Sequence, residues 1–369
     1  MTVGPEAAAE LARLGLYDPA APDADQRLAL VEFLMERETT IDEIRSAVDL
    51  QSLAALAFRH TFGVAGDRVT LSEAAARTGV AEERAAKILR AAGLPDPELQ
   101  GVHAGSVRLI ELFSTFAELV GEDQALHLAR IINSSVVRIA EAGMAATRVN
   151  VEIPLRAEGI VGLEFMKLFA EIGEDLFVGL NYAVDAVFRE KLVELSLRSW
   201  DVDAEGSAMI VEQAVGFADI VGFSERVDVA TMKDLAQIVD DFESRVSDAL
   251  VRAGGRVAKL IGDEVMFVAD DAPTACECAS ALVGLAVAGA IPDVRIGVAF
   301  GNVMSRFGDI YGPVVNIAAR LVAIASPGEV LVTAPIAERA EEFSFETQVP
   351  RRLKGIAEPV EHSRLCGRA

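Results

Sequence analysis

The pattern of apolar and polar residues changes near residue 202. Before that point, apolar positions recur every three to four residues, as in residues 26–36, 107–128 and 155–180, which predicts amphipathic helices. From residue 207 onward, short apolar runs alternate with amphipathic segments, which is typical of a mixed α/β domain. The chain is therefore predicted to have an all-helical first half and an α/β second half.

The boundary between the halves follows a predicted helix at residues 185–200, and residues 202–206 (VDAEG) end its pattern. We expect residues 1–184 to form a helical regulatory or dimerisation domain, residues 185–202 a helical linker, and residues 203–369 the second domain. A helical linker transmits motion between domains better than a flexible Gly/Ser linker does. The linker is therefore a candidate switching element.

The second half alternates strands with helices. Its predicted strands are residues 208–217, the hairpin 256–270, 294–301, 329–333 and two closing strands near 346 and at 360–365. Its predicted helices are residues 231–252, 273–288, 313–324 and 335–342. This order predicts one α/β sandwich with a mixed sheet.

Two segments of the helical half admit more than one interpretation. Residues 70–94 have a helix-turn-helix pattern with basic Arg84, Lys87 and Arg90, but two glutamates open the second helix, so a structural helical hairpin is favoured over a DNA-reading element. Residues 160–169 carry a long apolar face. Such a face needs a covering surface, which is the rest of the helical bundle, a second subunit or a lipid-like ligand.

The composition is that of a folded protein, 51% hydrophobic and 25% charged. The net charge of −23 argues against binding to nucleic acid, because phosphate groups would be repelled. The longest uncharged apolar run, residues 279–292, is shorter than the roughly 20 residues that cross a bilayer, and the first residues lack the features of a signal peptide. We therefore expect a cytoplasmic protein with no membrane segment, whose three cysteines are reduced.

The segment RVAKLIGDEVMFVAD (256–270) predicts a hairpin in which Gly262 forms the turn and Asp263 stands at its tip. Lys259 lies four residues earlier on the incoming strand. A second acid, Asp219, follows an apolar strand in FADIVGFS (217–224), beside a turn whose backbone N–H groups suit phosphate oxygens. If the two strands are neighbours, Asp219 and Asp263 form a platform for two divalent cations.

A third segment, GDIYGPVVNIAAR (308–320), places Asn316 and Arg320 four residues apart on one face of a predicted helix. Asp309 stands in the loop before that helix. An arginine and an asparagine on an otherwise apolar helix are candidates for contact with a substrate.

The segments FADIVGFS, KLIGDEVMF, DIYGPVVNIAAR and RRLKG occur in the order and at the spacings of class III nucleotidyl cyclases. Residues 207–366 resemble the catalytic domain of that family, which implies a ferredoxin-like α/β fold with a mixed sheet. The short loop between Asp309 and Asn316 is similar to that of actinobacterial adenylyl cyclases. The helical half resembles, through helical pattern and GLP-type turns, the autoinhibitory domain of pH-responsive mycobacterial members.

The resemblance implies that the ribose 3′-hydroxyl of ATP attacks the α-phosphate, which gives cyclic AMP and pyrophosphate. Asp219 and Asp263, with the carbonyl of Ile220, would bind two Mg²⁺ or Mn²⁺ ions. Asn316 would orient the ribose and Arg320 would stabilise charge on the α-phosphoryl group. The outer phosphates would be held by the turn after Asp219 and by a basic residue of RRLKG: Gly222, Phe223, Ser224 and Lys354.

Base choice follows from hydrogen bonding. Lys259 can donate to adenine N1 and Asp309 can accept from the N6 amino group, whereas guanine presents the opposite polarity at both positions. An unpaired buried polar group costs about 1–3 kcal/mol, so this pair predicts ATP over GTP.

In the family that the chain resembles, the site lies at a dimer interface, with the metal carboxylates from one subunit and the base-reading and transition-state residues from the other. This chain carries both sets, which implies a homodimer with two complete sites. One departure is Asn302, where some members have an arginine near the phosphates; Lys354 and the phosphate-binding turn are expected to suffice.

Two alternatives stay open. The first is a catalytically silent regulator that binds nucleotide or DNA through residues 70–94, and the second is a guanylyl or diguanylate cyclase. The metal carboxylates with Asn316 and Arg320 argue against the first, and Lys259 with Asp309 against the second. The hypothesis for regulation is that the helical half inhibits the catalytic half, with pH sensing by histidine, the residue type whose ordinary pKa is nearest to neutrality: His60, His103, His127 and His362.

Overall fold

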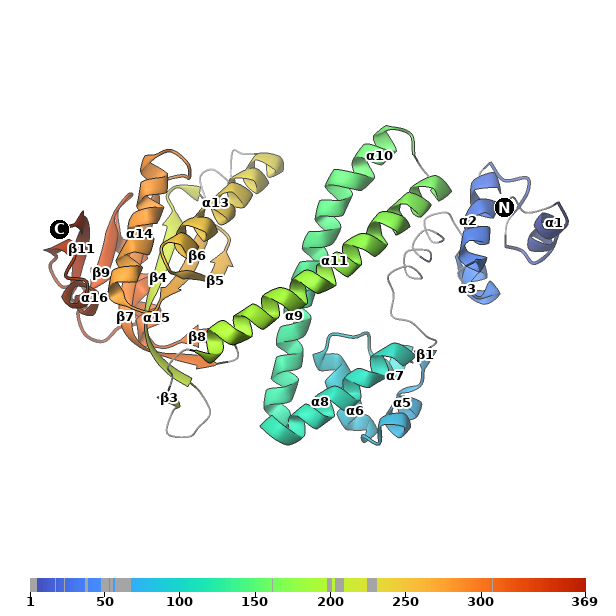
Figure 1. Ribbon diagram of the computed structural model, residues 1–369, viewed down its shortest axis with the longest axis horizontal. Coiled ribbons are helices and arrows are strands. Elements are labelled where there is room, and N and C mark those ends of the chain that lie inside the picture. The colour runs from blue at the N-terminus through green and yellow to red at the C-terminus, as the bar shows by residue number, and fades with distance from the viewer. Residues whose placement is uncertain are drawn as a thin grey trace. The chain divides into compact units, whose positions relative to one another are not determined.

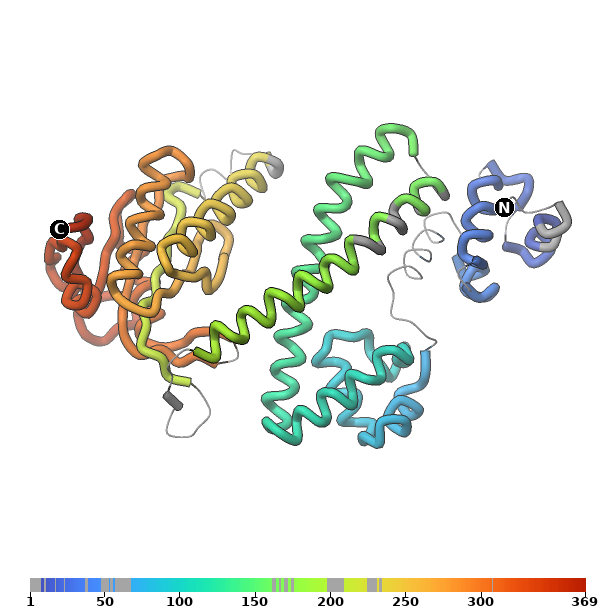
Figure 2. Tube along the Cα trace, viewed as in Figure 1, coloured from blue at the N-terminus to red at the C-terminus, as the bar shows by residue number. Residues whose placement is uncertain are grey.

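The computed structural model describes residues 5–369, except 17, 23, 37–38, 48–52, 54–55, 57–67, 161, 198–200, 203–208, 224–230 and 307. The chain splits into two compact units, Met1–Leu197 and Arg198–Ala369. Figure 1 labels their elements and Figure 2 traces the Cα path of the same view. Each unit has its own hydrophobic clusters and is described by itself.

The first unit is helical, as predicted. Its described α-helices are α1 Pro5–Arg13, α2 Ala24–Met35, α3 Ile41–Ser46, α5 Leu71–Thr78, α6 Glu82–Ala91, α7 Pro97–Gln100, α8 Val107–Val120, α9 Glu122–Thr147, α10 Ile153–Ala157 and α11 Gly162–Ser196. A short 3₁₀ turn, Ala104–Ser106, precedes α8, and a π-helical turn, Arg148–Glu152, joins α9 to α10. Two short strands that the pattern did not predict, β1 Arg68–Val69 and β2 Val102–His103, pair antiparallel.

Two predicted helices of this unit are interrupted at glycine. Residues 107–128 form parts of α8 and α9, because Gly121 adopts a φ of 94° and ends the first helix. Residues 155–180 are divided in the same way near Gly159, whose φ is 86°. In contrast, residues 185–196 are no separate helix but the end of α11 (Figure 1).

The helix-turn-helix segment is a structural hairpin. Thr70 and Glu73 form a capping box that starts α5, and Gly79 ends it in the left-handed conformation. The basic side chains of α6 all face acids: Arg84 lies 3.9 Å from Glu122, Lys87 2.9 Å from Glu83, and Arg90 2.5 Å from Glu98. These cations are compensated within the chain, which argues against a DNA-binding role.

The second unit is built on one mixed sheet. Its strands are β3 Asp201–Val202, β4 Met209–Ile220, β5 Arg256–Ile261, β6 Glu264–Ala269, β7 Val294–Arg306, β8 Asp309–Tyr311, β9 Val330–Thr333, β10 Phe343–Thr347 and β11 His362–Arg368. The order is β10-β11-β9-β7-β4-β6-β5, with β3 on β4 and β8 on β7. The β7–β9 pair is parallel and the other described pairs are antiparallel, so the predicted mixed sheet is confirmed.

Helices cover both faces of this sheet (Figure 1). On one face, α13 Met232–Arg252, α14 Ala272–Val287 and α16 Ala334–Arg339 pack on a core that includes Phe242, Phe267 and Leu282. On the other face, α15 Pro313–Ile324 packs on Val215 and Met266. Because side chains alternate along a strand, the residues of β4 divide between these two cores.

Gly297 of β7 sets how closely α15 approaches the sheet. A Cβ atom at this position would lie 2.3 Å from the backbone N of Val322 and 2.5 Å from the carbonyl of Ala318. Any side chain would therefore push α15 away. Only glycine allows this contact, which fixes the helix that carries Asn316 and Arg320 directly on β7.

Candidate active site

Asp219 lies near the end of β4, opposite Glu264 of β6 and Arg295 of β7. The sequence placed Asp219 just beyond a strand, but the strand continues to Ile220, because this residue is also apolar and pairs with β7. Asp219 has the same parity as Val215 and Phe217, so it lies on the face of the sheet that α15 covers.

The predicted hairpin is formed by β5 and β6, whose register pairs Ile261 with Glu264 across the turn Gly262–Asp263. Gly262 has a φ of 66°, which glycine adopts without steric cost. The backbone N–H of Ile220 donates to the carbonyl of Asp263 at 3.1 Å. This bond ties the hairpin tip to the end of β4 and brings Asp219 and Asp263 together, as the two-carboxylate platform requires.

Electrostatics at this platform are dominated by negative charge. Burial raises the pKa of the Asp263 carboxyl, and the charge of Asp219 raises it further. Burial, Asp219 and Asp263 likewise raise the pKa of Glu264. Arg295 opposes both shifts and donates to Oδ2 of Asp219 from Nε at 2.7 Å and from Nη2.

Sequence reasoning missed Glu264 and Arg295. Arg295 is a single cation within an apolar strand (VRIGVAF), and this break in the apolar pattern was the available signal. Its partner is 76 residues earlier, and only the strand register shows that the two meet.

The residues at the platform fit a divalent cation. The carboxylates of Asp219 and Asp263 and the carbonyl of Ile220 supply oxygen atoms, the ligands that Mg²⁺ and Mn²⁺ prefer. Burial, and to a smaller extent the charge of Asp219, raises the pKa of Asp263, and a bound cation would oppose this shift by favouring the ionised carboxylate. Among the described residues, no three His, Cys, Asp or Glu side chains form a complete metal-binding group, so a cation would complete its coordination with carbonyl, water or substrate oxygens.

The proposed adenine-reading residues are in contact. Nζ of Lys259, on β5, lies 2.6 Å from Oδ2 of Asp309. Asp309 is the first residue of β8 and not a loop residue, because residues 309–311 pair with β7, and the N–H of Ile310 donates to Oδ1 at 2.8 Å. Burial raises the pKa of Asp309, but the hydrogen bonds from Lys259 and Ile310 outweigh burial and the net shift is downward. Asp309 is therefore an ionised acceptor at neutral pH.

Asn316 and Arg320 lie on α15, whose bounds match the predicted helix 313–324. Its buried side packs on the sheet through Val314 and Ala318. Asn316 and Arg320 are exposed, and within the described part of the chain their side chains make no hydrogen bond or ion pair. Both polar groups are available to a ligand or a second chain.

The predicted phosphate-binding residues lie in two places. Gly222 has a φ of 71° in the turn after β4, and the Phe223 side chain packs on the core, so the backbone N–H of Phe223 is its available phosphate donor. Ser224 lies outside the described residues. Lys354 is exposed in a turn after the buried Leu353.

Asn302 lies far along β7 from the carboxylate platform. It pairs with Glu212, whereas Arg295 pairs with Asp219. Seven residues of strand separate Asn302 from Arg295, roughly 23 Å. The guanidinium at the platform is therefore that of Arg295, and within one chain an arginine at position 302 would lie remote from Asp219.

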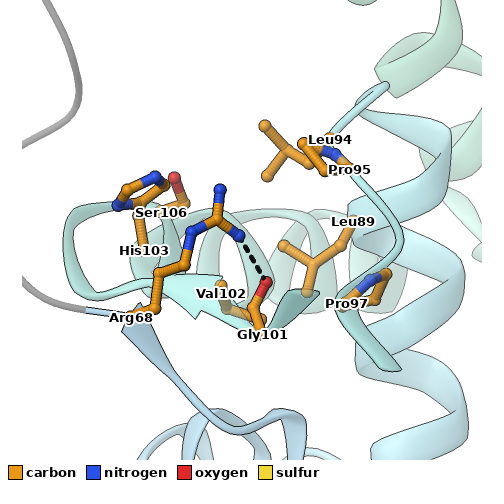
Figure 3. A pocket seen from close by; sticks show the side chains of 9 residues that line it. All are labelled: Arg68, Leu89, Leu94, Pro95, Pro97, Gly101, Val102, His103 and Ser106. Carbon is orange, nitrogen blue, oxygen red and sulfur yellow. Dashed lines mark hydrogen bonds between the residues drawn. The ribbon is translucent and has the colours of Figure 1, made fainter. Parts of the chain in front are cut away.

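In the helical unit, Figure 3 shows a small cavity between Arg68, Leu89 and His103. Its water-sized space is about 20 Å³, and Arg68 donates to the carbonyl of Gln100 at 2.8 Å. This cavity has room for about one water molecule and is too small for a lipid-like ligand. Binding of such a ligand elsewhere in the helical unit stays a prediction. No described helix is both long enough and apolar enough to cross a membrane.

The candidate pH sensors are dispersed. His362 is buried in β11 and its Nδ1 donates to the carbonyl of Val360 at 3.1 Å, which is a structural contact. His103 lines the small cavity, and His127 lies on α9. His60 falls outside the described residues.

Residues 208–362 match the profile of the family described as adenylate and guanylate cyclase catalytic domain. An adenylate cyclase of Streptomyces coelicolor is 32% identical over 280 residues, which cover 73% of this chain and 71% of that protein. The second unit is shorter than this alignment, so the similarity extends into the helical unit. A Mycobacterium tuberculosis protein described as a pH-sensitive adenylate cyclase is 28% identical over 350 residues, which cover 90% of this chain and 85% of that protein.

Among solved structures, the adenylyl cyclase CyaB from P. aeruginosa superposes with a TM-score of 0.39 at 20% identity. The match covers 44% of this chain and 97% of that chain.

Proposed function

This chain belongs to the class III nucleotidyl cyclases, and we propose that it is an adenylate cyclase that converts ATP to 3′,5′-cyclic AMP and pyrophosphate. The observation that carries the choice of substrate is the contact of Lys259 with Asp309, 2.6 Å apart. The names of its relatives in Streptomyces and Mycobacterium support the same activity.

The carboxylates of Asp219 and Asp263, with the carbonyl of Ile220, would hold two divalent cations. When bound, such cations favour ionisation of the ribose 3′-hydroxyl and neutralise charge on the departing pyrophosphate. The chain's own contribution is to hold the triphosphate in line. The backbone N–H groups of Gly222 and Phe223 and the side chain of Lys354 are the proposed phosphate donors.

Arg320 and Asn316 carry the proposed chemistry on α15. The guanidinium of Arg320 would donate to the α-phosphoryl oxygens as negative charge develops on them, and Asn316 would hold the ribose. Both side chains are exposed and unpaired in the described chain, so they could bind a substrate without first breaking a contact within the chain.

A homodimer with shared sites is the proposed assembly. Asp219 and Asp263 would act with the second copy's adenine-reading and transition-state residues, so that each dimer has two sites related by two-fold symmetry. The absence of partners for Asn316 and Arg320 within the described chain supports this arrangement.

The first prediction tests the proposed activity together with its proposed inhibition by the helical unit. Full-length protein and a chain that starts at Val202 are each incubated with ATP and Mn²⁺ between pH 5.5 and 8. Cyclic AMP and pyrophosphate are both measured, and they should form in equal amounts. We expect product from both, with a higher rate from the shorter chain, because the helical unit is proposed to inhibit.

Two results would contradict parts of this proposal. If neither chain forms cyclic AMP, the assigned activity is wrong. If the ratio of the two rates is one at every pH, inhibition and pH sensing by the helical unit are both wrong while the activity stands.

The second prediction concerns base choice. Lys259→Met removes the donor to adenine N1 and leaves Asp309 without its cation, so kcat/KM for ATP should fall roughly 10- to 100-fold and the preference for ATP over GTP should decrease. Rates with both nucleotides measure the two effects. Arg364→Gln, which removes a comparable exposed ion pair with Glu346, is the matched control and should change neither. If the ratio of kcat/KM for ATP to kcat/KM for GTP is the same in Lys259→Met as in the wild type, Lys259 does not read the base.

A further inference from the structure

Arg295 donates hydrogen bonds to one of the two carboxylates proposed to bind metal, that of Asp219. Its Nε and Nη2 both donate to the same oxygen, Oδ2 of Asp219. The Asp219 side chain is 17% exposed and that of Arg295 is 37% exposed, so the pair is only partly accessible to water. The two residues pair directly across β4 and β7, and the contact is therefore set by the register of the sheet.

The charge of Arg295 acts on the whole acidic group at this edge. It binds Asp219 directly, and it opposes the effects that Asp219 exerts on Asp263 and Glu264. Three carboxyl groups close to one another would repel each other without a cation. Within the described chain, the guanidinium of Arg295 is a cation in contact with this group.

A divalent ion and a guanidinium would compete for the same carboxylate, that of Asp219. If a cation binds Oδ2 of Asp219, two positive groups stand within a few ångströms of each other in a partly buried place, where their repulsion is weakly screened. The guanidinium has a flexible side chain and a partly exposed position, so it can move away while the carboxylate stays in the strand.

We propose that Arg295 is an internal counter-cation of the metal site, which holds Asp219 in the metal-free protein and is displaced when a divalent cation binds. The inference rests on the proposed function only in assigning Asp219 to a metal. Its consequence is that metal affinity is set by an exchange of cations. If the pair is closed for 90–99% of the time, the affinity of the site is lowered roughly 10- to 100-fold.

The test is Mn²⁺ binding to the full-length protein without nucleotide, followed by the electron paramagnetic resonance of free Mn²⁺. Arg295→Gln should bind Mn²⁺ about tenfold or more tightly than the wild type. Its thermal unfolding midpoint should be lower without metal and should rise more on addition of Mn²⁺. Adding Asp219→Asn to this variant should abolish the gain.

Two further variants separate the proposal from simpler effects. Arg339→Gln also removes one arginine charge, here from an exposed ion pair with Glu212, which lies on β4 as Asp219 does. This variant should bind Mn²⁺ as the wild type does. Arg295→Lys keeps the charge but cannot make the two-donor contact, and its affinity should lie between those of the wild type and Arg295→Gln. It also serves if the glutamine variant does not fold.

The proposal is overturned if Arg295→Gln binds Mn²⁺ no more tightly than the wild type, or if neither protein binds it. An Arg295→Lys variant that binds Mn²⁺ as tightly as Arg295→Gln would also overturn it, because a retained positive charge would then not compete with the metal. Loss of the cyclase assignment is a separate outcome, since cyclic AMP formation by the wild type tests it and the Mn²⁺ comparison does not depend on it.

Discussion

Asp219→Asn is expected to reduce the rate of cyclic AMP formation by about 100- to 1,000-fold, the cost of removing one group that stabilises charge in a transition state. The substitution keeps the size of the side chain but removes the negative charge that would hold a cation. It also removes the charged partner of Arg295, so the positive charge of the guanidinium is less compensated at the place where a cation would bind. Initial rates at saturating ATP and Mn²⁺ measure the effect.

A change in fold must be separated from this loss. Glu212→Gln is a matched control, because Glu212 is an exposed residue on the same strand as Asp219, and the substitution removes the same negative charge. It should retain nearly the wild-type rate, and both variants should keep the wild-type circular dichroism spectrum. If Asp219→Asn keeps more than about a tenth of the wild-type rate, Asp219 does not hold a cation that the reaction needs.

Mixing two inactive variants should restore activity. In a shared site, Asp219 of one chain acts with Arg320 of the other. A dimer of one Asp219→Asn chain and one Arg320→Ala chain therefore has one site with both defects and one with neither. With random pairing, the mixture should reach about a quarter of the wild-type rate, although each variant alone is inactive.

The matched control combines both substitutions in one chain. A wild-type chain paired with that double variant has one defect in each site, so mixing the two should lower the activity per wild-type chain. If the single variants do not complement and the double variant does not interfere, the site is complete within one chain and the interfacial arrangement is wrong. Co-expression of both chains ensures that mixed dimers form.

Much of the fold follows from local pattern. The change of hydrophobic period separated helical from mixed structure, and the Gly-Asp turn and the helix from Pro313 are where the sequence predicts them, because turn and helix signals act over a few residues. Asp309 was misplaced in a loop because β8 is only three residues long and exists through its pairing with β7.

What could not be read from the sequence is the long-range register. Asp219 was identified from its position after an apolar run, but its pairing with Arg295 and Glu264 depends on how β4, β6 and β7 align. A shift of one residue in that alignment would turn these side chains to the opposite face, and nothing local in the sequence excludes it. The identity of the carboxylates was therefore predictable, and the cation that neutralises them was not.

The contact at Gly297 has a consequence for control of the enzyme. At Gly297, α15 packs with its backbone against the backbone of β7, so Arg320 and Asp219 of one chain lie on two closely packed elements. An inhibitory signal that loosened this domain from within would have to break that contact. If the site is shared between two copies, as proposed, the signal would instead change the angle or distance at which the two halves of the site meet.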